Sequence, residues 1–342
     1  RARGEPVHQA QGLVAPDVLA RGTFVPPTLI EVDRIERLER EVFGPVLHVV
    51  RFRREDLDRL VERVNALGYG LTLGIHSRVD GKIERIVRRA RAGNVYVNRN
   101  MVGAVVGVQP FGGEGLSGTG PKAGGPLYLY RLLSKCPADA ALAELHAAVQ
   151  AGARVPSVSH SDALESLRDW ALRARPALAA LCDHLASLNP VGASVGLPGP
   201  TGERNTYRLF ARETVLCLAE SEGDLLSQLA LVLALGGKAL CTRSALAPAL
   251  LEELPMAVRS SLTLVDDWAG GGARFDAALH HGAQEARIAI QRKLAALPGP
   301  IVSLHGFDPG EAPLAIERLL VERVVSVNTA AAGGNASLMT IG

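Results

Sequence analysis

The chain contains 342 residues, of which 47% are hydrophobic and 21% charged, and its formal net charge is +2. This composition is typical of an ordinary globular protein, and so small a net charge gives no sign of a nucleic-acid-binding surface. The longest apolar run, residues 229–237, is far shorter than the ~20 residues that a membrane-spanning helix needs. We therefore expect a soluble chain without a membrane span, long enough for two domains.

The cysteines and the first residues add two expectations. Cys136, Cys182, Cys217 and Cys241 are far apart in the sequence and form no CxxC pair. Such spacing is typical of reduced thiols, so we expect a cytoplasmic protein with no disulfide and no metal site. The chain begins with arginine, shows no secretory leader and enters a strand-like segment early. We interpret it as the C-terminal part of a longer protein.

Apolar patterning in the first half alternates between the strand and helix periods. Helical spacing of apolar residues and short β-branched runs each recur between residues 46 and 98. The predicted elements are a strand at 46–52, a helix at 55–68, a strand at 70–77, a helix at 82–93 and a strand at 94–98. This alternation predicts a parallel α/β construction.

A glycine-dense loop follows, with nine glycines between residues 101 and 126. Glycine lets the backbone adopt positive φ or approach a ligand closely. Loops of this length are usually functional, although a mobile surface loop also fits the pattern. The next segment, "PLYLYRLLS" at 126–134, is predicted to be a strand.

The composition changes after residue 134. Residues 135–160 are rich in Ala, Pro and Ser, which predicts a short helix and a linker. Helix and strand patterns then alternate again, so we predict a second α/β domain over residues 161–342. Its predicted elements are helices at 161–175, 224–235 and 285–297, and strands at 213–220, 238–243, 299–307 and 322–328.

An internal echo joins the two halves. Residues 70–98 and 299–328 both run through a strand, a histidine, a polar loop and a helix before ending in Val-x-Val-Asn. A true structural duplication and the recurrence of a common α/β unit both fit this pattern.

Three motifs occur in an informative order: "EVFGPVL" at 41–47, "GNVYVNRN" at 93–100 and "QPFGGEGLSGTGPKAGGP" at 109–126. Together they resemble the C-terminal part of an aldehyde dehydrogenase catalytic domain. More narrowly, residues 102–132 resemble the glutamate γ-semialdehyde dehydrogenase module of the proline utilization A (PutA) family, bacterial bifunctional flavoenzymes that oxidise proline to glutamate. The resemblance covers residues 1–134 and implies NAD as the cofactor and glutamate γ-semialdehyde as the substrate.

The resemblance implies cofactor roles for two residues of the first motif. Glu41 would accept hydrogen bonds from the nicotinamide ribose, and Phe43 would pack near the nicotinamide. A carboxylate can receive two hydroxyl donors, and a flat ring can hold a second flat ring in place. Spacing alone favours a different interpretation, a surface acid beside a core anchor.

The resemblance also implies a substrate site in the glycine-dense loop. Gly103 and Ala104 would hold the substrate carboxylate through their backbone N–H groups, since small residues let an anion approach the main chain. Phe111 would form one wall of an aromatic box, or else be an ordinary core residue. The segment around Tyr128 and Tyr130 resembles the strand through which such subunits form dimers, which implies a possible homodimer.

The expected nucleophile is missing. The family places its cysteine upstream of the first motif, and residues 1–40 contain no cysteine. We therefore predict no catalytic residue in this chain, and inactivity without the missing upstream domains of the same protein. FAD would belong only to an absent proline dehydrogenase part.

Residues 161–342 resemble the extra C-terminal domain of longer PutA proteins, a degenerate Rossmann-like domain of the aldehyde dehydrogenase type. The segments after its strands lack the residues that active relatives use, so we expect no NAD to bind there. Its tail, almost uncharged, is expected to pack over the active-site region or a tunnel. The alternative function is therefore a non-catalytic structural and oligomerisation module that acts as a tunnel lid.

Overall fold

The computed structural model describes residues 5–10, 12, 15–133, 161–243, 248–270 and 272–330. The predicted linker at 135–160, Cys136 and the tail beyond residue 330 lie outside these residues. Two compact units are present. The first holds the residues up to Tyr69 together with Glu84–Arg91, and the second holds Gly70–Ile83 and the residues from Ala92 onward.

The first unit contains a three-stranded sheet in the order β1-β2-β3. β1 (Val7–Gln9) is antiparallel to β2 (Thr28–Val32), and β2 is parallel to β3 (Val46–Val50). The strand predicted at 46–52 and the helix predicted at 55–68 are confirmed. The remaining elements are α1 (Pro16–Leu19), η1 (Ile35–Arg37), η2 (Arg54–Asp56), α2 (Leu57–Ala66) and the C-terminal half of α3 (Asp80–Arg89).

Polar contacts connect the helices of this unit. Asn65 of α2 donates from Nδ2 to the carbonyl of Arg89 at 2.8 Å and accepts the Arg91 N–H at 2.9 Å. The side chain thus satisfies backbone groups that the end of α3 leaves unpaired. Asp58 forms ion pairs with Arg85 and Arg89, which lie one helical turn apart.

The second unit contains a parallel sheet in the order β12-β11-β10-β13-β14. Its strands are β10 (Thr214–Ala219), β11 (Lys238–Thr242), β12 (Leu262–Val265), β13 (Ala277–His281) and β14 (Ser303–Phe307). The strands predicted at 213–220, 238–243 and 299–307 are confirmed. β10 and β11 align Cys217 with Cys241 in register.

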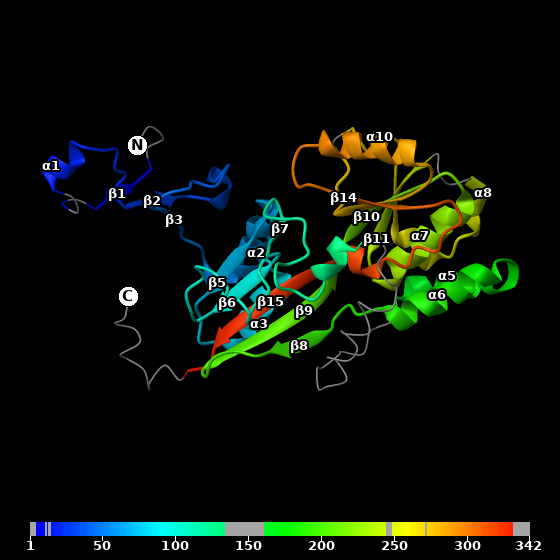
Figure 1. The fold of residues 1–342 in the computed structure, drawn as a ribbon, viewed down its shortest axis with the longest axis horizontal. Helices are drawn as coiled ribbons and strands as arrows, with labels where there is room; N and C mark the ends of the chain where they lie inside the picture. Colours follow the sequence, from blue (N-terminus) through cyan, green and yellow to red (C-terminus); the bar gives the residue numbers. More distant parts are fainter. Residues whose placement is uncertain are drawn as a thin grey trace. The chain divides into compact units, whose positions relative to one another are not determined.

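Helices cover both faces of this sheet (Figure 1). Alternate strand residues divide between two cores: Val215 and Cys217 join the cluster with α5, α6 and α7, while Leu216 packs with Leu294 of α10. α7 lies between the sheet and the α5–α6 pair, which explains why ten of its residues are buried. The helices are α5 (Asp162–Ala174), α6 (Pro176–Leu188), α7 (Glu222–Ala234), α8 (Pro248–Glu253), α9 (Met256–Ser260) and α10 (Gln284–Ala295).

A second sheet of the same unit draws strands from both halves of the sequence. Its order is β5-β6-β15-β9-β8, and β15 is parallel to β6 but antiparallel to β9. Figure 1 shows β15, in red, lying beside β9 in green. The strands are β5 (Thr72–Ile75), β6 (Asn94–Val97), β8 (Ser194–Leu197), β9 (Glu203–Ala211) and β15 (Leu320–Asn328). Hydrogen bonding is therefore continuous across the proposed boundary at 135–160, and the division into domains at that point stays a prediction.

A buried polar cluster holds β15 against the glycine-dense loop. Glu322 of β15 accepts the Lys122 N–H at 2.6 Å and the Tyr207 hydroxyl at 2.8 Å. The Lys122 Nζ donates to Asn94 Oδ1 at 2.8 Å. Burial lowers the pKa of Lys122 to about 8 and raises the pKa of Glu322 above its usual range. Because these groups are desolvated, each depends on the hydrogen bonds of the others.

One expectation is wrong. The segment at 126–134 was expected to be a strand, but Leu129–Leu132 form the 3₁₀ helix η3. Tertiary packing explains the difference, since Leu127 is buried in the main core and Tyr130 packs against it. Of the two explanations left open for the internal echo, the structure excludes duplication, because β5 and β6 pair directly whereas β14 and β15 lie in different sheets.

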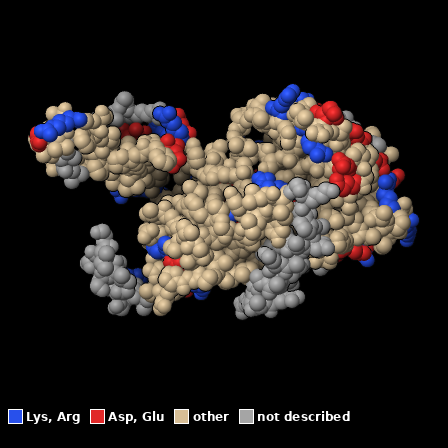
Figure 2. All heavy atoms as spheres, viewed as in Figure 1, with Lys and Arg blue, Asp and Glu red and all other residues tan. Residues whose placement is uncertain are grey.

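Charged side chains are interspersed by sign on the face shown in Figure 2, in keeping with the small net charge. The remaining short elements are β4 (Tyr69–Gly70), β7 (Glu114–Gly115) and η5 (Ile316–Leu319).

The Tyr207→Phe variant tests the buried cluster. Losing the hydroxyl leaves Glu322 with one fewer donor in a desolvated site, so we expect the free energy of unfolding to fall by about 1.5–3 kcal/mol. Urea denaturation measures this change. Tyr128→Phe, at a half-exposed hydroxyl, is the control and should change it by less than about 0.5 kcal/mol. Equal effects of the two variants would contradict the role of the cluster.

Candidate functional site

Glu41 and Phe43 lie in the first unit, on the segment that leads into β3. The Pro45 carbonyl accepts the Thr28 N–H at 2.8 Å, which fixes the end of this segment to β2. Phe43 is 94% exposed, and Glu41 is also exposed. Among the described residues the Glu41 carboxylate has no hydrogen-bond or ion-pair partner. Both side chains are thus available to an external group.

Gly103 and Ala104 lie in the second unit, in the loop between β6 and Gln109. We call residues 100–108 the anchor loop. Neither the Gly103 N–H nor the Ala104 N–H donates a hydrogen bond to any residue in the described part of the chain. A Cβ added at Gly103 would meet no atom within 4 Å. The loop therefore has two neighbouring backbone donors without a partner in the described part of the chain, beside open space at the Gly103 Cβ position.

Phe111 is half-buried and is fixed by its backbone. Its N–H donates to the Ala123 carbonyl at 3.0 Å, and its carbonyl accepts the Ala123 N–H at 2.9 Å. Asn94 of β6 holds both neighbours: its Nδ2 donates to the Pro110 carbonyl at 2.9 Å, and its Oδ1 accepts the Gly112 N–H at 3.2 Å. The ring is thus carried by a rigid segment, as a binding wall requires.

The position of Gly93 admits no side chain. A Cβ there would lie 1.8 Å from the Gly112 carbonyl oxygen, so only glycine lets the Phe111 segment approach the start of β6 this closely. Gly93 and Asn94 lie inside the motif at 93–100, but no role was predicted for either residue. Their signal was the direct Gly-Asn entry into a strand whose residues are all buried.

The predicted site residues fall in two compact units. Glu41 and Phe43 belong to the first unit, and Gly103, Ala104 and Phe111 belong to the second. Within the second unit the structure brings Phe111 and the anchor loop onto one continuous segment that begins at β6. The cofactor-binding and substrate-binding assignments stay predictions.

Comparisons with known proteins match residues 2–134 to the aldehyde dehydrogenase family. This segment belongs to the aldehyde dehydrogenase family. The whole chain is 52% identical to a stretch covering 26% of the bifunctional protein PutA of Escherichia coli (strain K12). The PutA of Rhizobium meliloti is 46% identical over 94% of this chain and 26% of its own length. The predicted relationship to both families is confirmed, and the chain spans about a quarter of the length of these relatives.

Two further relatives extend this picture. A 1-pyrroline-5-carboxylate dehydrogenase of Bacillus subtilis (strain 168) is 44% identical over 32% of this chain and 21% of its own length. The solved structure of PutA from Corynebacterium freiburgense aligns with 96% of this chain and 30% of that protein, with a TM-score of 0.61 and 22% identity. That likeness shows the fold alone, and it confirms the predicted α/β fold of the aldehyde dehydrogenase type.

The described cysteines offer this aldehyde dehydrogenase segment no reactive thiolate. Cys182, Cys217 and Cys241 are at most 1% exposed and lie in the main core of the second unit. Burial raises the pKa of Cys182 to about 12, and a hydrogen bond with Cys241 together with burial raises the pKa of Cys217. A nucleophilic cysteine needs the opposite environment.

The N-terminus of α7, which follows β10 of the parallel sheet, already has a carboxylate bound to it. Ser221 caps α7 by accepting the Asp224 N–H at 3.1 Å and donates to Asp224 Oδ2 at 2.7 Å. Asp224 Oδ1 accepts the Gly310 N–H at 2.9 Å, which fastens the loop after β14 to this end of the helix. The positive end of the helix dipole thus already has a carboxylate, which disfavours a bound phosphate.

A small solvent-open cleft of about 50 Å³ lies between η3, η5 and the glycine-dense loop, and none of the predicted site residues lines it. His305 lines this cleft, and its Nε2 has no hydrogen-bond partner. Burial, reinforced by the nearby Arg318, Arg212 and Arg131, lowers the pKa of His305 to about 3. The imidazole is therefore neutral in the folded chain. In the part of the chain that the structure describes, no helix is suited to crossing a bilayer and no cluster of metal-ligating side chains occurs.

The His305→Gln variant tests this environment through pH. An unfolded histidine takes up a proton near pH 6.5, whereas folded His305 does so only near pH 3, so stability is lost as the pH falls below 6.5. Between pH 7 and pH 5 this single group should remove about 2 kcal/mol from the free energy of unfolding. His305→Gln should flatten that part of the pH profile measured by urea denaturation. His184→Gln, on the exposed face of α6, is the control and should keep the original slope.

Proposed function

We propose that this chain supplies part of an NAD-dependent L-glutamate γ-semialdehyde dehydrogenase site in proline catabolism. The observation that carries the proposal is the pair of unoccupied backbone donors at Gly103 and Ala104. Two adjacent N–H groups suit a carboxylate, which the semialdehyde carries at the end remote from its reacting carbon. The relative from Bacillus subtilis, named a 1-pyrroline-5-carboxylate dehydrogenase, supports the proposal through its 44% identity over 32% of this chain.

The residues of this chain would bind and orient the substrate and NAD. The nucleophile would come from an upstream part of the longer protein. The anchor loop would hold the substrate carboxylate, and Phe111 would cover the aliphatic carbons of the substrate. Glu41, exposed and without a partner among the described residues, fits the ribose hydroxyls of NAD, and the exposed ring of Phe43 fits its nicotinamide. The cofactor would supply hydride acceptance.

Co-expression with the missing upstream half tests this proposal. The reconstituted protein should reduce NAD in the presence of glutamate γ-semialdehyde, while the chain alone should not. NADH absorbance measures the rate. Association of the two halves without activity would overturn the enzyme proposal and favour the second candidate function.

The Gly103→Trp variant probes the substrate site within the active protein. A Cβ at Gly103 meets no neighbour, so the fold should tolerate the indole while the indole blocks the carboxylate. We expect kcat/KM for the semialdehyde to fall at least about 100-fold, since a well-placed charged hydrogen-bonding contact contributes ~3 kcal/mol. Gly81→Trp adds the same bulk where a Cβ also meets no atom, and it should leave the rate unchanged.

The Glu41→Gln variant probes the cofactor site. The amide keeps the shape of the side chain but loses one acceptor for ribose hydroxyls, so KM for NAD should rise about 5- to 20-fold with little change in KM for the aldehyde. Initial rates at varied NAD measure this. Glu39→Gln, two residues upstream, is the control. An equal effect of both variants would contradict the assignment of Glu41.

The second candidate function is a non-catalytic structural and oligomerisation module that acts as a tunnel lid. The carboxylate that fills the α7 N-terminus favours this role for residues 161–330. In the natural-length protein, removal of the parallel-sheet part should then disturb assembly or coupled NADH production without removing any contact to the cofactor. Size-exclusion chromatography and the lag before NADH forms measure the two effects.

A further inference from the structure

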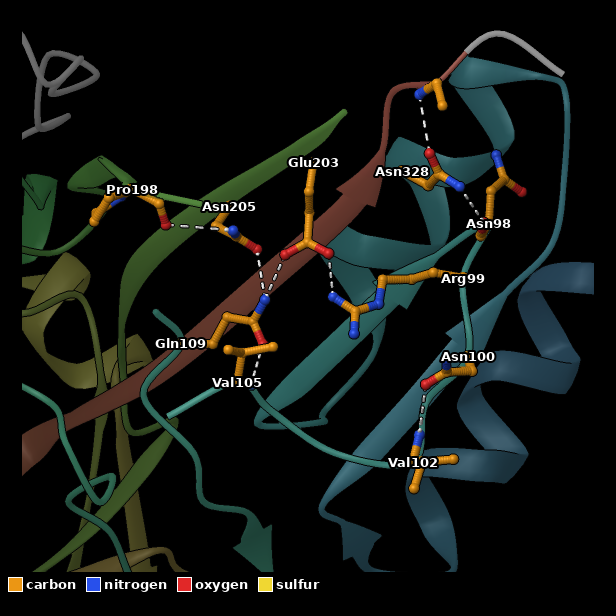
Figure 3. A network of polar contacts seen from close by, with 11 residues as sticks. Asn98, Arg99, Asn100, Val102, Val105, Gln109, Pro198, Glu203, Asn205 and Asn328 are labelled. Carbon is orange, nitrogen blue, oxygen red and sulfur yellow. Dashed lines mark hydrogen bonds and ion pairs between the residues drawn. The ribbon is translucent and has the colours of Figure 1, made fainter. Parts of the chain in front are cut away.

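Gln109 has a buried side chain in which every polar atom is used. It is 4% exposed. Its Oε1 accepts the Val105 N–H at 3.0 Å, and its Nε2 donates to Glu203 Oε1 at 2.7 Å and to Asn205 Oδ1 at 2.9 Å (Figure 3). A reversed amide would set its oxygen against two acceptors, so this orientation is fixed. Gln109 therefore ties the anchor loop at Val105 to strand β9.

Glu203 holds the other end of the same loop. Its second carboxylate oxygen pairs with Arg99, which directly follows the Asn98 turn after β6. Both side chains of this pair are at most 16% exposed, so solvent screens the pair only weakly. Figure 3 shows the Glu203 carboxylate between Arg99 and Gln109. One side chain thus contacts the residues on both sides of the anchor loop.

The sheet fixes Glu203 and Asn205 in place. Glu203 aligns with Asn328 of β15 and Asn205 aligns with Ser326, while β15 itself pairs with β6. Asn328 also donates to the Asn98 carbonyl at 3.2 Å. The two acceptors therefore cannot shift without moving the strand that completes the sheet.

The anchor loop has few other contacts. Val102 and Val106 are 91% and 98% exposed, and the donors of Gly103 and Ala104 are unused among the described residues. Because packing holds this loop only weakly, the hydrogen bonds and the ion pair at its two ends determine its geometry.

We infer that Glu203 and Asn205 are positioning residues for the anchor loop, and that Asn205 acts through Gln109 while Glu203 acts through both Gln109 and Arg99. They set the spacing of the Gly103 and Ala104 donors, and with it the preference for aldehydes that carry a carboxylate. This inference rests on the proposed function. It gives the second half of the chain, where we expect no cofactor to bind, a part in substrate selection without contact to substrate.

The experiment compares two substrates in the natural-length protein. Glutamate γ-semialdehyde carries the carboxylate, and propanal does not. With Glu203→Gln, KM for the semialdehyde should rise about 5- to 50-fold with a smaller change in kcat, while kcat/KM for propanal stays within twofold. A purely structural defect would lower both. Arg204→Gln, exposed on the same strand, is the control and should keep the wild-type ratio.

A double-mutant cycle tests the route through Gln109. If Asn205 acts through that amide, adding Asn205→Ser to Gln109→Ala should change the substrate ratio no further. Additive effects would overturn the route. Asn205→Ser, which removes one acceptor for Gln109 and a long hydrogen bond to the Pro198 carbonyl, should shift the ratio in the same direction by a smaller factor. It serves as the test if Glu203→Gln fails to fold.

The outcomes distinguish a failure of the positioning role from a failure of the proposed dehydrogenase function. A wild-type protein that does not oxidise the semialdehyde with NAD overturns the proposed function. An active wild type whose Glu203→Gln and Asn205→Ser variants keep the substrate ratio, or lose activity on both substrates equally, overturns the positioning role alone.

Discussion

The insertion of β15 between β6 and β9 is the constraint on which the second unit depends. It joins the aldehyde dehydrogenase strands β5 and β6 to strands that come a hundred residues later, and it carries Glu322 into contact with Lys122. Without that pairing, β9 would have no fixed relation to β6. The acceptors of Glu203 and Asn205 would then have no fixed relation to Gln109. The positions of the groups that hold the anchor loop therefore depend on the long-range pairing of this one strand.

Local patterns predicted most of the elements, because periodicity reports which face of a segment is buried. The strand at 46–52 and the helix at 55–68 follow directly from it. η3 was not predicted, because the short apolar and aromatic run at 126–134 is typical of a strand. In the structure Leu127 is buried in the core and Tyr130, three residues later, packs against the same core. The pairing of β15 with β6 was not predicted either, because the pattern of one apolar strand does not indicate which other strand it pairs with.

The residues of the candidate site also fall into those that the sequence predicted and those that it did not. The resemblance pointed to Gly103, Ala104 and Phe111, and the geometry found around them suits the roles proposed. Gln109 lies in the motif at 109–126, but no role was predicted for it. The role of an amide side chain depends on its hydrogen-bond partners, and the sequence does not show which residues these are. Glu203 and Asn205 were unreachable from the sequence, since they meet Gln109 only through the strand order. Such residues can be recognised in a structure as buried polar side chains, because buried polar groups are almost always hydrogen-bonded.

The position of β15 in the sequence has a consequence for synthesis. Asn98 and Asn328, which meet at the end of this sheet, are 230 residues apart. During translation, the edge of β6 is complete long before the strand that covers it leaves the ribosome. An uncovered strand edge offers unpaired N–H and C=O groups to other chains. The nascent protein therefore has a window in which aggregation competes with folding, and that window closes only when residues 320–328 emerge.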